Sequence, residues 1–350
     1  MTETLTISVD AMGGDHGPSV VVPGVAKAAA ESSRLQFVLY GDEATISAEL
    51  ARQPSLQGRV EVRHTDRVVA MDEKPAQALR RGKGTSMWSA IEAVKAGQAQ
   101  AAVSAGNTGA LMAMSLLILR MSVPVERPCL VVSWPGVKGV STVLDVGANV
   151  DCDAERLVEF AIMGEAFHRA AHGVARPSVG LLNIGSEEMK GHEEVRQAHA
   201  ILRSGKFDLD YRGFVEGDEL SQNKTDVIVT DGFTGNIALK TAEGTAKYVG
   251  GELRAALTSS LITKLGALLA RSGLLAFREK LSPDAAAPLL GLNGVVVKSH
   301  GGASERDIAS AIRMAAKLAR SDFAAEIERN MTRLTAAVAD QQPPAVDGAA

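Results

Sequence analysis

Residues 7–28 read ISVDAMGGDHGPSVVVPGVAKA, and the order of residue types in this stretch sets the fold class. The β-branched run at residues 7–9 predicts a short buried strand, and a glycine-rich loop follows it. The small residues after Pro18 predict a helix, because proline is favoured at the first helical position. A strand, a glycine loop and a helix in this order are typical of α/β proteins that bind a phosphate group.

The glycine loop lacks the spacing of the common nucleotide-binding motifs. Its three glycines do not match the offsets of G-x-G-x-x-G, and it carries Asp10, Asp15 and His16, which are unusual beside a pyrophosphate. The stretch RRGKGTS contains Gly82 and Lys83, but no glycine stands at the upstream position that a P-loop requires. We therefore do not expect this loop to bind a nucleotide.

The composition is that of a globular protein with a sizeable core. The chain has 350 residues, of which 46% are hydrophobic and 22% are charged. A formal net charge of −4 argues against a protein that coats nucleic acid. Two cysteines, Cys129 and Cys152, are too few for a disulfide framework, and we find no secretory signal and no apolar run of roughly 20 residues. We expect a cytoplasmic protein.

Short apolar runs alternate with helical patterns along most of the chain. The runs end in Gly, Asp or Ser, as buried strands do: LTISVDA, QFVLYG, QAAVSAG, CLVVSW, STVLDVGA, SVGLLNIG, TDVIVTDG and GVVVKSHG. Helical spacing occurs between several of them, for example in residues 89–98, 155–171 and 308–330. This alternation predicts an α/β fold with a mostly parallel sheet covered by helices on both faces. We expect residues 1–335 to form one domain and residues 336–350 to be a disordered tail.

Five loops at the predicted strand ends combine glycine with polar residues. Besides the opening loop, these loops contain Gly106, Asn107, Thr108 and Gly109; Asp145, Gly147, Asn149 and Asp151; Asp231, Gly232, Thr234, Gly235 and Asn236; and Lys298, His300, Gly301 and Gly302. Each loop alone fits an ordinary turn or helix cap. Because ligands bind at the carboxyl ends of parallel strands, we expect the loops to gather at one edge and form a wide site for an anion. Lys190 follows a further strand end and is either an ordinary surface lysine or the cation of this site.

Ser104 raises the alternative of a serine hydrolase. The stretch AVSAG resembles the nucleophile elbow G-x-S-x-G, and Asp231 and His300 follow in the order of a hydrolase triad. Ala102 stands where the first glycine of the elbow is needed, so the match is incomplete. The hypothesis predicts that Ser104→Ala abolishes activity.

Histidine and cysteine spacing does not indicate a metal site. His168 and His172 are one helical turn apart, but the glutamate of H-E-x-x-H is absent. We expect both histidines on a solvated helix face. The two cysteines are too far apart in the sequence for a structural zinc pattern, so we expect no metal.

Residues 252–282 form an apolar and basic segment. Leucines recur at helical spacing in Leu253, Leu257, Leu261, Leu265 and Leu268, and residues 253–280 have an excess of four positive charges. One interpretation is a helical hairpin packed on the core and broken at Ser272 and Gly273. The other is an interfacial contact with a membrane or with an acidic carrier protein. The residues expected in this contact are Arg254, Leu261, Lys264, Leu268, Arg271, Leu274, Leu275, Phe277 and Arg278.

Six motifs in order resemble the bacterial phosphate acyltransferases of phospholipid synthesis. They are DAMGGDHGP, VSAGNTGALMA, LDVGAN, GLLNIGSEEMKG, DGFTGN and KSHGGAS, and the similarity runs from residue 7 to about residue 330. The resemblance implies a three-layer α/β/α Rossmann-like sandwich similar to the isocitrate and isopropylmalate dehydrogenases, a homodimer, and no cofactor. It also implies transfer of a long-chain fatty acyl group from acyl carrier protein to inorganic phosphate, giving acyl phosphate. Trp88 and the last motif depart from the family pattern.

The resemblance also implies where the protein works. Members of the family are peripheral membrane proteins, so we expect association with the inner face of the cell membrane. The enzyme that next acylates glycerol-3-phosphate is an expected partner, and nucleic acid is not. A non-catalytic scaffold for lipid-synthesis enzymes and an oxidoreductase of the related dehydrogenase fold remain as alternatives.

The expected chemistry needs no nucleophile from the protein, because phosphate is itself a competent oxygen nucleophile. The protein has to hold two reactants in attack geometry and stabilise charge on the thioester oxygen. We expect catalytic roles for Lys190, Asn236, Asn107, Asn149 and His300. Residues expected to bind substrate are Asp10, Gly13, Gly14, His16, Gly106, Thr108, Gly109, Asp231, Gly232, Thr234, Gly235 and Gly301.

Overall fold

The computed structural model describes residues 4–122, 125–205, 207–281 and 286–323, together with residues 325, 327 and 329. The disordered tail predicted at residues 336–350 and residue 282 of the predicted amphipathic segment lie outside this part of the chain. The prediction of one domain over residues 1–335 stays a prediction.

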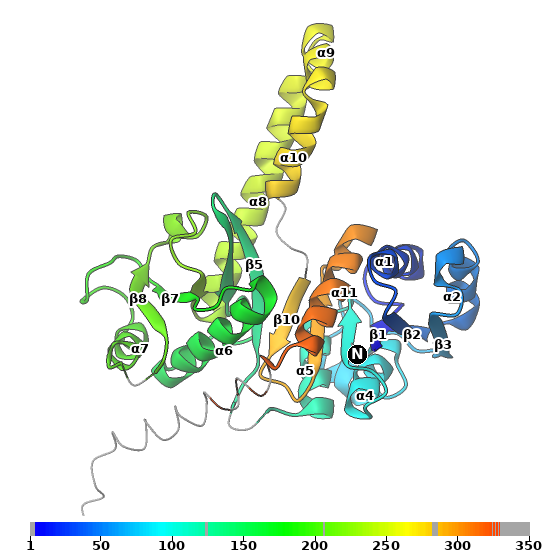
Figure 1. The fold of residues 1–350 in the computed structure, drawn as a ribbon, viewed down its shortest axis with the longest axis horizontal. Helices are drawn as coiled ribbons and strands as arrows, with labels where there is room; N and C mark the ends of the chain where they lie inside the picture. The colour runs from blue at the N-terminus through cyan, green and yellow to red at the C-terminus, as the bar shows by residue number, and fades with distance from the viewer. Residues whose placement is uncertain are drawn as a thin grey trace, which may run out of the picture.

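One sheet of eleven strands runs through the molecule (Figure 1). In spatial order the strands are β3 (Val60–His64), β2 (Leu35–Gly41), β1 (Leu5–Asp10), β4 (Ala101–Ser104), β11 (Val295–Ser299), β10 (Ala286–Leu290), β5 (Cys129–Gly136), β6 (Gly139–Leu144), β9 (Val227–Val229), β7 (Ser178–Leu182) and β8 (Asp210–Val215). The helices are α1 (Pro18–Glu31), α2 (Glu43–Leu50), α3 (Pro75–Arg81), α4 (Ser86–Lys95), α5 (Thr108–Leu119), α6 (Ala154–His172), α7 (Glu193–Arg203), α8 (Gly232–Leu257), α9 (Leu261–Leu269), α10 (Arg271–Leu281) and α11 (Glu305–Arg320).

Helices cover both faces of the sheet, as predicted. Buried residues of α1, α6 and α11 pack in one core cluster, and buried residues of α4 and α5 pack in another. Successive residues of β4 point to different clusters, since Val103 belongs to the first and Ala102 to the second. The three-layer α/β/α architecture with a mostly parallel sheet is therefore confirmed.

Strand direction reverses in the middle of the sheet, and this corrects the prediction of a single edge. The strands β3, β2, β1, β4 and β11 are parallel to one another, as are β6, β9, β7 and β8. Between these groups, β10 and β5 make antiparallel pairs with each other and with their outer neighbours. Three reversals leave the two groups pointing in opposite directions. Their carboxyl ends, and the loops that follow them, therefore point to opposite edges of the sheet.

Three strands escaped the sequence analysis. β3 and β8 are the two edge strands, and their sequences VEVRH and DYRGFV mix charged with apolar residues. β10 has the sequence AAPLL, and its Pro288 lacks the N–H that a central strand normally uses. Local helix signals were more informative. Pro18 begins α1, as predicted, and Ser304 and Asp307 form the capping box of α11.

The helices α8, α9 and α10 project from the body as an arm (Figure 1). The predicted break at Ser272 and Gly273 is wrong, because both residues lie inside α10. The chain turns instead at residues 258–260 and at Ala270, so the leucine stripe is divided between two helices. No helix in the ranges that the structure describes combines the length and apolar character needed to cross a bilayer.

Candidate functional site

The loops singled out in the sequence form two groups. The first loop set consists of residues 10–17, 104–109 and 298–304, which follow β1, β4 and β11. The second loop set consists of residues 145–151 and 231–236, which follow β6 and β9. Lys190 follows β7, which is parallel to β9, so it lies toward the edge of the second loop set. Of the expected catalytic residues, Asn107 and His300 belong to the first set, and Asn149 and Asn236 to the second.

The opening loop packs closely against its neighbours in the first loop set. The backbone N–H of Asp15 donates to the carbonyl oxygen of Gly301 at 2.9 Å. A Cβ at Gly13 would stand 2.6 Å from Oδ2 of Asp10 and 2.7 Å from the backbone nitrogen of Gly106. A side chain at Gly13 would therefore force the first loop set apart.

Ser104 is a structural residue in this geometry. Its side chain is buried, its Oγ donates to Oδ2 of Asp10 at 2.7 Å, and it accepts the backbone N–H of Gly106 at 3.0 Å. Asp231 belongs to the other loop set, and His300 is exposed. The triad of the hydrolase hypothesis is therefore not assembled, and its acid lies toward the opposite edge of the sheet.

Asn107 caps α5 and ties it to the preceding segment. Its Oδ1 accepts the backbone N–H of Ala110 at 3.0 Å, while its Nδ2 donates to the carbonyl oxygens of Met71 and Glu73 at 2.8 and 2.9 Å. The amide is thus engaged within the protein. Thr108 is exposed at the start of the helix, where backbone N–H groups are free to bind an anion.

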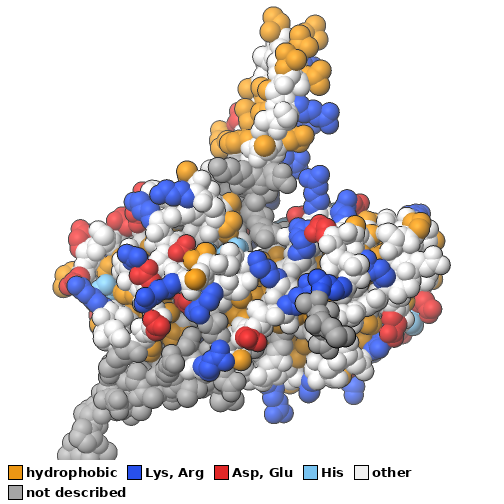
Figure 2. Space-filling view, viewed as in Figure 1, with side chains coloured by type: hydrophobic (Ala, Val, Ile, Leu, Met, Phe, Trp, Pro, Cys, Tyr) orange, Lys and Arg blue, Asp and Glu red, His pale blue; other side chains and the backbone are white. Residues whose placement is uncertain are grey.

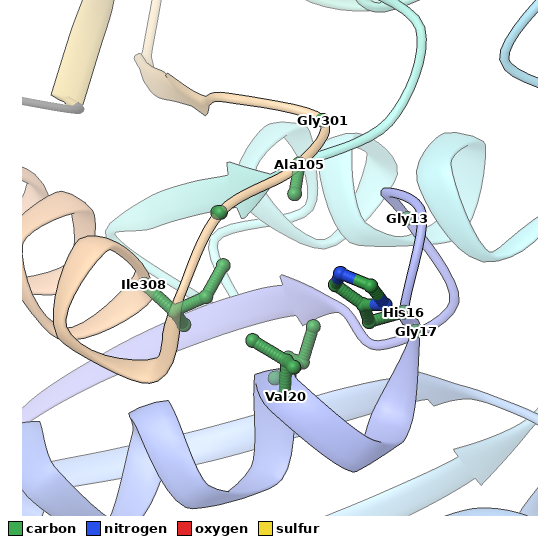
Figure 3. Close-up of a pocket in the computed structure, with 9 residues that line it drawn as sticks. Gly13, His16, Gly17, Val20, Ala105, Gly301 and Ile308 are labelled. Atoms are coloured by element: carbon green, nitrogen blue, oxygen red, sulfur yellow. The ribbon is translucent and has the colours of Figure 1, made fainter. Parts of the chain in front are cut away.

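A small pocket opens between the opening loop and the β11 loop (Figure 3). It is lined by His16, Gly17, Val20, Ala105, Gly301 and Ile308, among others. Figure 3 shows the imidazole of His16 projecting beside the glycine loop, with Ala105 and Gly301 across the pocket. His300, next to Gly301, accepts the N–H of Gly302 at Nδ1, so its neutral ring carries the proton on Nε2.

Asp145 organises the second loop set. This fully buried carboxylate accepts the backbone N–H groups of Leu130, Ala148 and Asn149 and the Nδ2 amide of Asn149. Burial raises its pKa and these hydrogen bonds oppose the rise. Asn149 also donates to the carbonyl oxygen of Pro128 at 2.8 Å, so both of its amide N–H groups are engaged. A donor role toward substrate stays a prediction and requires these bonds to open.

The loop after β9 is a helix cap with one accessible amide. Asp231 caps α8, since its carboxylate accepts the N–H and the hydroxyl of Thr234 at 2.8 and 2.7 Å. Gly235 packs so closely that a Cβ there would overlap the backbone oxygen of Asp145. Asn236 is exposed beside Gly147, and its side chain forms no hydrogen bond to the residues that the structure describes. It is the amide of this set that a substrate can reach.

Lys190 is exposed on a loop held in place by Asn183. The Nδ2 of Asn183, a residue that the sequence analysis missed, donates to the carbonyl oxygens of Gly185 and Lys190 at 3.1 and 3.2 Å. Gly191 follows with a φ of 87°, which favours glycine. The ammonium group of Lys190 is therefore presented to solvent.

The histidine prediction is wrong for His168. This residue is 1% exposed, and its Nδ1 lies 2.8 Å from the hydroxyl of Thr142 on β6. His172 is half-buried and its ring centre lies 4.6 Å from that of His168. The α6 helix is covered on most sides, so the spacing of the histidines did not indicate a solvated face. No cluster of three or more potential metal ligands occurs in the described part of the chain.

Sequence analysis named Lys298 in the β11 loop but assigned it no role. The structure buries it, with 6% of its surface exposed, in register with Ser104 of β4. Ser104 is in turn in register with Asp10 of β1. The signal in the sequence was a lysine at the end of the β-branched run VVV, in a strand that is otherwise buried.

Comparison with known proteins matches almost the whole chain. The sequence model of the family described as "Fatty acid synthesis protein" matches residues 5–326. The chain is 68% identical over 350 residues to the phosphate acyltransferase of Phenylobacterium zucineum, covering 100% of both chains. It is 61% identical over 354 residues to the phosphate acyltransferase of Caulobacter vibrioides, covering 99% of this chain and 98% of that one.

Among solved structures, the fold is similar to a phosphotransacetylase from Streptococcus pyogenes. The TM-score is 0.62 at 18% sequence identity, covering 90% of this chain and 94% of the other. At this identity the likeness shows a shared α/β fold.

Proposed function

Because the chain belongs to the phosphate acyltransferase family and is an acyltransferase of fatty acid and phospholipid synthesis, we propose that its acyl donor is a long-chain acyl thioester of acyl carrier protein and its product acyl phosphate. The observation that carries this proposal is the full-length match to proteins named phosphate acyltransferase. The two glycine-rich loop sets and the accessible Asn236 and Lys190 support it, since they offer donors to an anion.

The proposed reaction is a direct transfer. An oxygen of hydrogen phosphate attacks the thioester carbonyl carbon and forms a C–O bond. The C–S bond then breaks, and sulfur leaves with the bonding electron pair. The proton of hydrogen phosphate goes to this thiolate, so the products are acyl phosphate and the carrier thiol, with no further reactant.

The exposed polar residues supply the roles that this reaction needs. Lys190 is a partner for phosphate or for the developing oxyanion, and Asn236 donates from the start of α8. His300, whose Nε2 carries the proton in the neutral ring, relays a proton to the departing thiol. Asn107 and Asn149, whose amides are engaged internally, act by holding their loops in place.

The test is a reaction of the purified protein with palmitoyl-acyl carrier protein, with and without inorganic phosphate. Free thiol and acyl phosphate are both measured, for the wild type, Lys190→Ala and Ser104→Ala. We expect phosphate-dependent acyl phosphate that Lys190→Ala loses and Ser104→Ala retains. Thiol release without phosphate, lost in Ser104→Ala, would instead identify a hydrolase, and no turnover at all would favour the scaffold.

We propose that the arm formed by α8, α9 and α10 rests on the membrane surface. Figure 2 shows apolar side chains at the tip of the arm and basic side chains along its flank. Leu261, Ile262 and Leu269 are each at least 80% exposed, although the sequence analysis named only the first. Exposed apolar residues beside basic ones are typical of interfacial helices. In this proposal the protein works at the inner face of the cell membrane, where its acyl product meets the next acyltransferase.

Vesicle binding tests the arm. Burying a leucine-sized side chain contributes roughly 1.5–3 kcal/mol, so changing Leu261 and Ile262 to Ser should weaken binding to anionic vesicles by at least about 100-fold. Leu117→Ser is the matched control, because Leu117 is 53% exposed on α5, away from the arm. Equal binding of all three proteins would rule out the arm as the contact.

A homodimer is the remaining part of the proposal, and α8 supports it. Only Gly232 and Gly235 are buried in this 26-residue helix, while Phe233, Ile237 and Tyr248 are 60%, 50% and 68% exposed. Large exposed apolar surfaces mark interaction sites. Sedimentation should give a dimer that Ile237→Glu converts to a monomer; a monomeric wild type would refute this assignment.

A further inference from the structure

A cluster of basic residues on and beside α3 has no part in the chemistry described so far. Residues 74–83, KPAQALRRGK, carry four basic residues and no acidic one, in a chain whose formal net charge is −4. Arg67 joins them, because its guanidinium donates to the carbonyl oxygen of Lys83 at 3.2 Å. The cluster, called the basic patch below, consists of Arg67, Lys74, Arg80, Arg81 and Lys83.

The basic patch is exposed and almost unpaired. All five of its residues are exposed. Within the ranges that the structure describes, its one ion pair is that of Arg81 with Glu73, whose atoms are 4.0 Å apart. With the acidic neighbours counted, residues 66–83 still hold five basic residues against three acidic ones. Positive charge that is not neutralised within the protein attracts an acidic partner.

Close contacts fix the basic patch to the first loop set. The Nδ2 of Asn107 donates to the carbonyl oxygen of Met71 at 2.8 Å. A Cβ at Gly109 would stand 2.6 Å from Cγ of Pro75, the first residue of α3. A Cβ at Gly301 would likewise stand 2.6 Å from Cε of Met71. A partner bound to the basic patch is therefore held beside the loops that follow β4 and β11.

Two apolar side chains are exposed in the same segment. Val68 and Met71 are 42% and 41% exposed, and in the sequence they lie between Arg67 and Lys74. Protein interfaces combine an apolar centre with a polar rim, whereas small ligands bind in enclosed pockets. This surface is therefore suited to a protein partner.

The position of the basic patch separates it from the arm. Ala78 of α3 packs in the same core cluster as Leu111 and Met114 of α5. Figure 1 shows α5 in the body of the molecule, well away from the tip of the arm. Interfacial helices enter a bilayer by only about 5–10 Å. An arm that rests on the membrane with its tip therefore leaves α3 in water, where a soluble protein can reach it.

We propose that the basic patch docks the acidic acyl carrier protein and thereby brings its thioester to the first loop set. The inference rests on the proposed function, in which this carrier supplies the acyl group. It assigns the carrier protein and the membrane to two different surfaces, the basic patch and the arm. Complementary charges accelerate association and fix the orientation of two proteins. The basic patch therefore determines the affinity for the carrier and not the reaction at the thioester.

The test is the KM for palmitoyl-acyl carrier protein in the double variant Arg80→Glu with Lys83→Glu. Both residues are exposed, and neither forms an ion pair in the described part of the chain. We expect the KM to rise about tenfold, which corresponds to about 1.4 kcal/mol, because like charges then face each other across the interface. Both kcat at saturating carrier and the KM for phosphate should stay unchanged. Lys74→Glu, just before α3, should raise the KM for the carrier several-fold on its own.

The matched control is the double variant Arg34→Glu with Arg52→Glu, which changes the net charge by the same amount. Both residues are exposed. They precede the parallel strands β2 and β3, whereas the basic patch follows the end of β3, so they lie toward the opposite edge of the sheet. The control should keep the KM of the wild type for the carrier.

Salt dependence distinguishes electrostatic docking from a structural effect. Raising NaCl from about 50 to about 300 mM shortens the range of interactions between surface charges. The KM for the carrier should therefore rise with salt in the wild type and in the control. It should stay level or fall in Arg80→Glu with Lys83→Glu, because salt there screens a repulsion.

The outcomes separate this inference from the proposed function. A wild type that does not turn over palmitoyl-acyl carrier protein would overturn the proposed function itself. An active wild type whose KM for the carrier is unchanged in the patch variants, or rises equally in the control, would overturn only the inference. Weaker binding of the patch variants to anionic vesicles at an unchanged KM would identify a membrane contact and would also overturn it. If the double variant does not fold, the single variant Lys74→Glu decides.

Discussion

Acid should destabilise the folded protein through His168, and replacing this residue with Gln should remove that sensitivity. Burial, and next the positive charge of His172, lower the pKa of His168 from 6.5 to about 4, while Asp226 opposes the decrease. Between these two pH values the unfolded chain binds a proton at His168 that the folded chain does not. Above about pH 6.5 His168 is neutral in both states and does not change the free energy of unfolding. As the pH falls from 6.5 toward 4, the free energy of unfolding decreases progressively.

The size of the effect follows from the two pKa values. Each pH unit between the two pKa values changes the free energy of unfolding by about 1.36 kcal/mol. Over the whole interval between them the change amounts to about 3 kcal/mol. Glu159 acts in the opposite direction, because burial raises its pKa from 4.5 to about 7 and the folded state binds its proton more readily. The measurement must therefore be the difference between wild type and His168→Gln, in which the contribution of Glu159 cancels.

Urea unfolding at several pH values between 7 and 4 provides this difference. Gln keeps a polar group near Thr142 but does not titrate. We expect the wild type to lose most of about 3 kcal/mol relative to His168→Gln as the pH falls through this range. Two parallel curves of unfolding free energy against pH would refute the reasoning, because they would show that His168 titrates equally in both states.

Three further changes test the loop sets. Gly235→Ala should prevent the second loop set from closing, and thermal unfolding should show a sharply lower melting temperature. Gly244→Ala is the control on the same helix. Its added Cβ meets nothing within 4 Å, so it should stabilise the protein by up to about 1 kcal/mol. Asp145→Asn places an amide where four N–H groups donate, so urea unfolding should show a loss of about 2–4 kcal/mol; an unchanged midpoint would contradict the assigned bonds. Ser104→Ala removes the hydroxyl that donates to Oδ2 of Asp10 and should cost about 1–3 kcal/mol in stability, while the folded fraction keeps its rate of acyl phosphate formation.

Local features of the fold were predictable because they depend on neighbouring residues. Pro18 begins a helix and Ser304 caps another for reasons contained within a few positions of the chain. The strand runs were equally visible where both faces of the strand are buried. The charged edge strands β3 and β8 were not, since their apolar residues face only a partial core.

The opposite direction of the two halves was partly readable from the sequence. Only two residues separate β5, which ends at Gly136, from β6, which begins at Gly139, and a parallel connection needs about a dozen or more. This link therefore had to be an antiparallel hairpin. β10 is antiparallel to both of its neighbours, so its two reversals cancel, and its short AAPLL sequence with a proline gave no strand signal. The two loop sets were expected at one edge because the hairpin between β5 and β6 was not recognised.

The candidate site depends on contacts between distant residues, which limits what sequence patterns can predict. The row formed by Asp10, Ser104 and Lys298 exists only because β4 lies between β1 and β11. The engagement of Asn107 and Asn149 in internal hydrogen bonds likewise follows from tertiary packing. The sequence patterns identified the polar loops correctly. They did not indicate which side chains of these loops remain accessible to a substrate.

The position of β11 also has a consequence for synthesis of the chain on the ribosome. β11 pairs with β4, but it is translated roughly 190 residues later, which at about 5–20 residues per second takes roughly 10–40 s. During this interval β4, whose four residues are all buried in the finished sheet, has an open edge on the side that β11 will occupy. Open apolar edges promote aggregation, so the nascent N-terminal half is a candidate for chaperone binding. Lys298 arrives with that last strand, and the row at the end of β1 and β4 is completed only when almost the entire chain has been made.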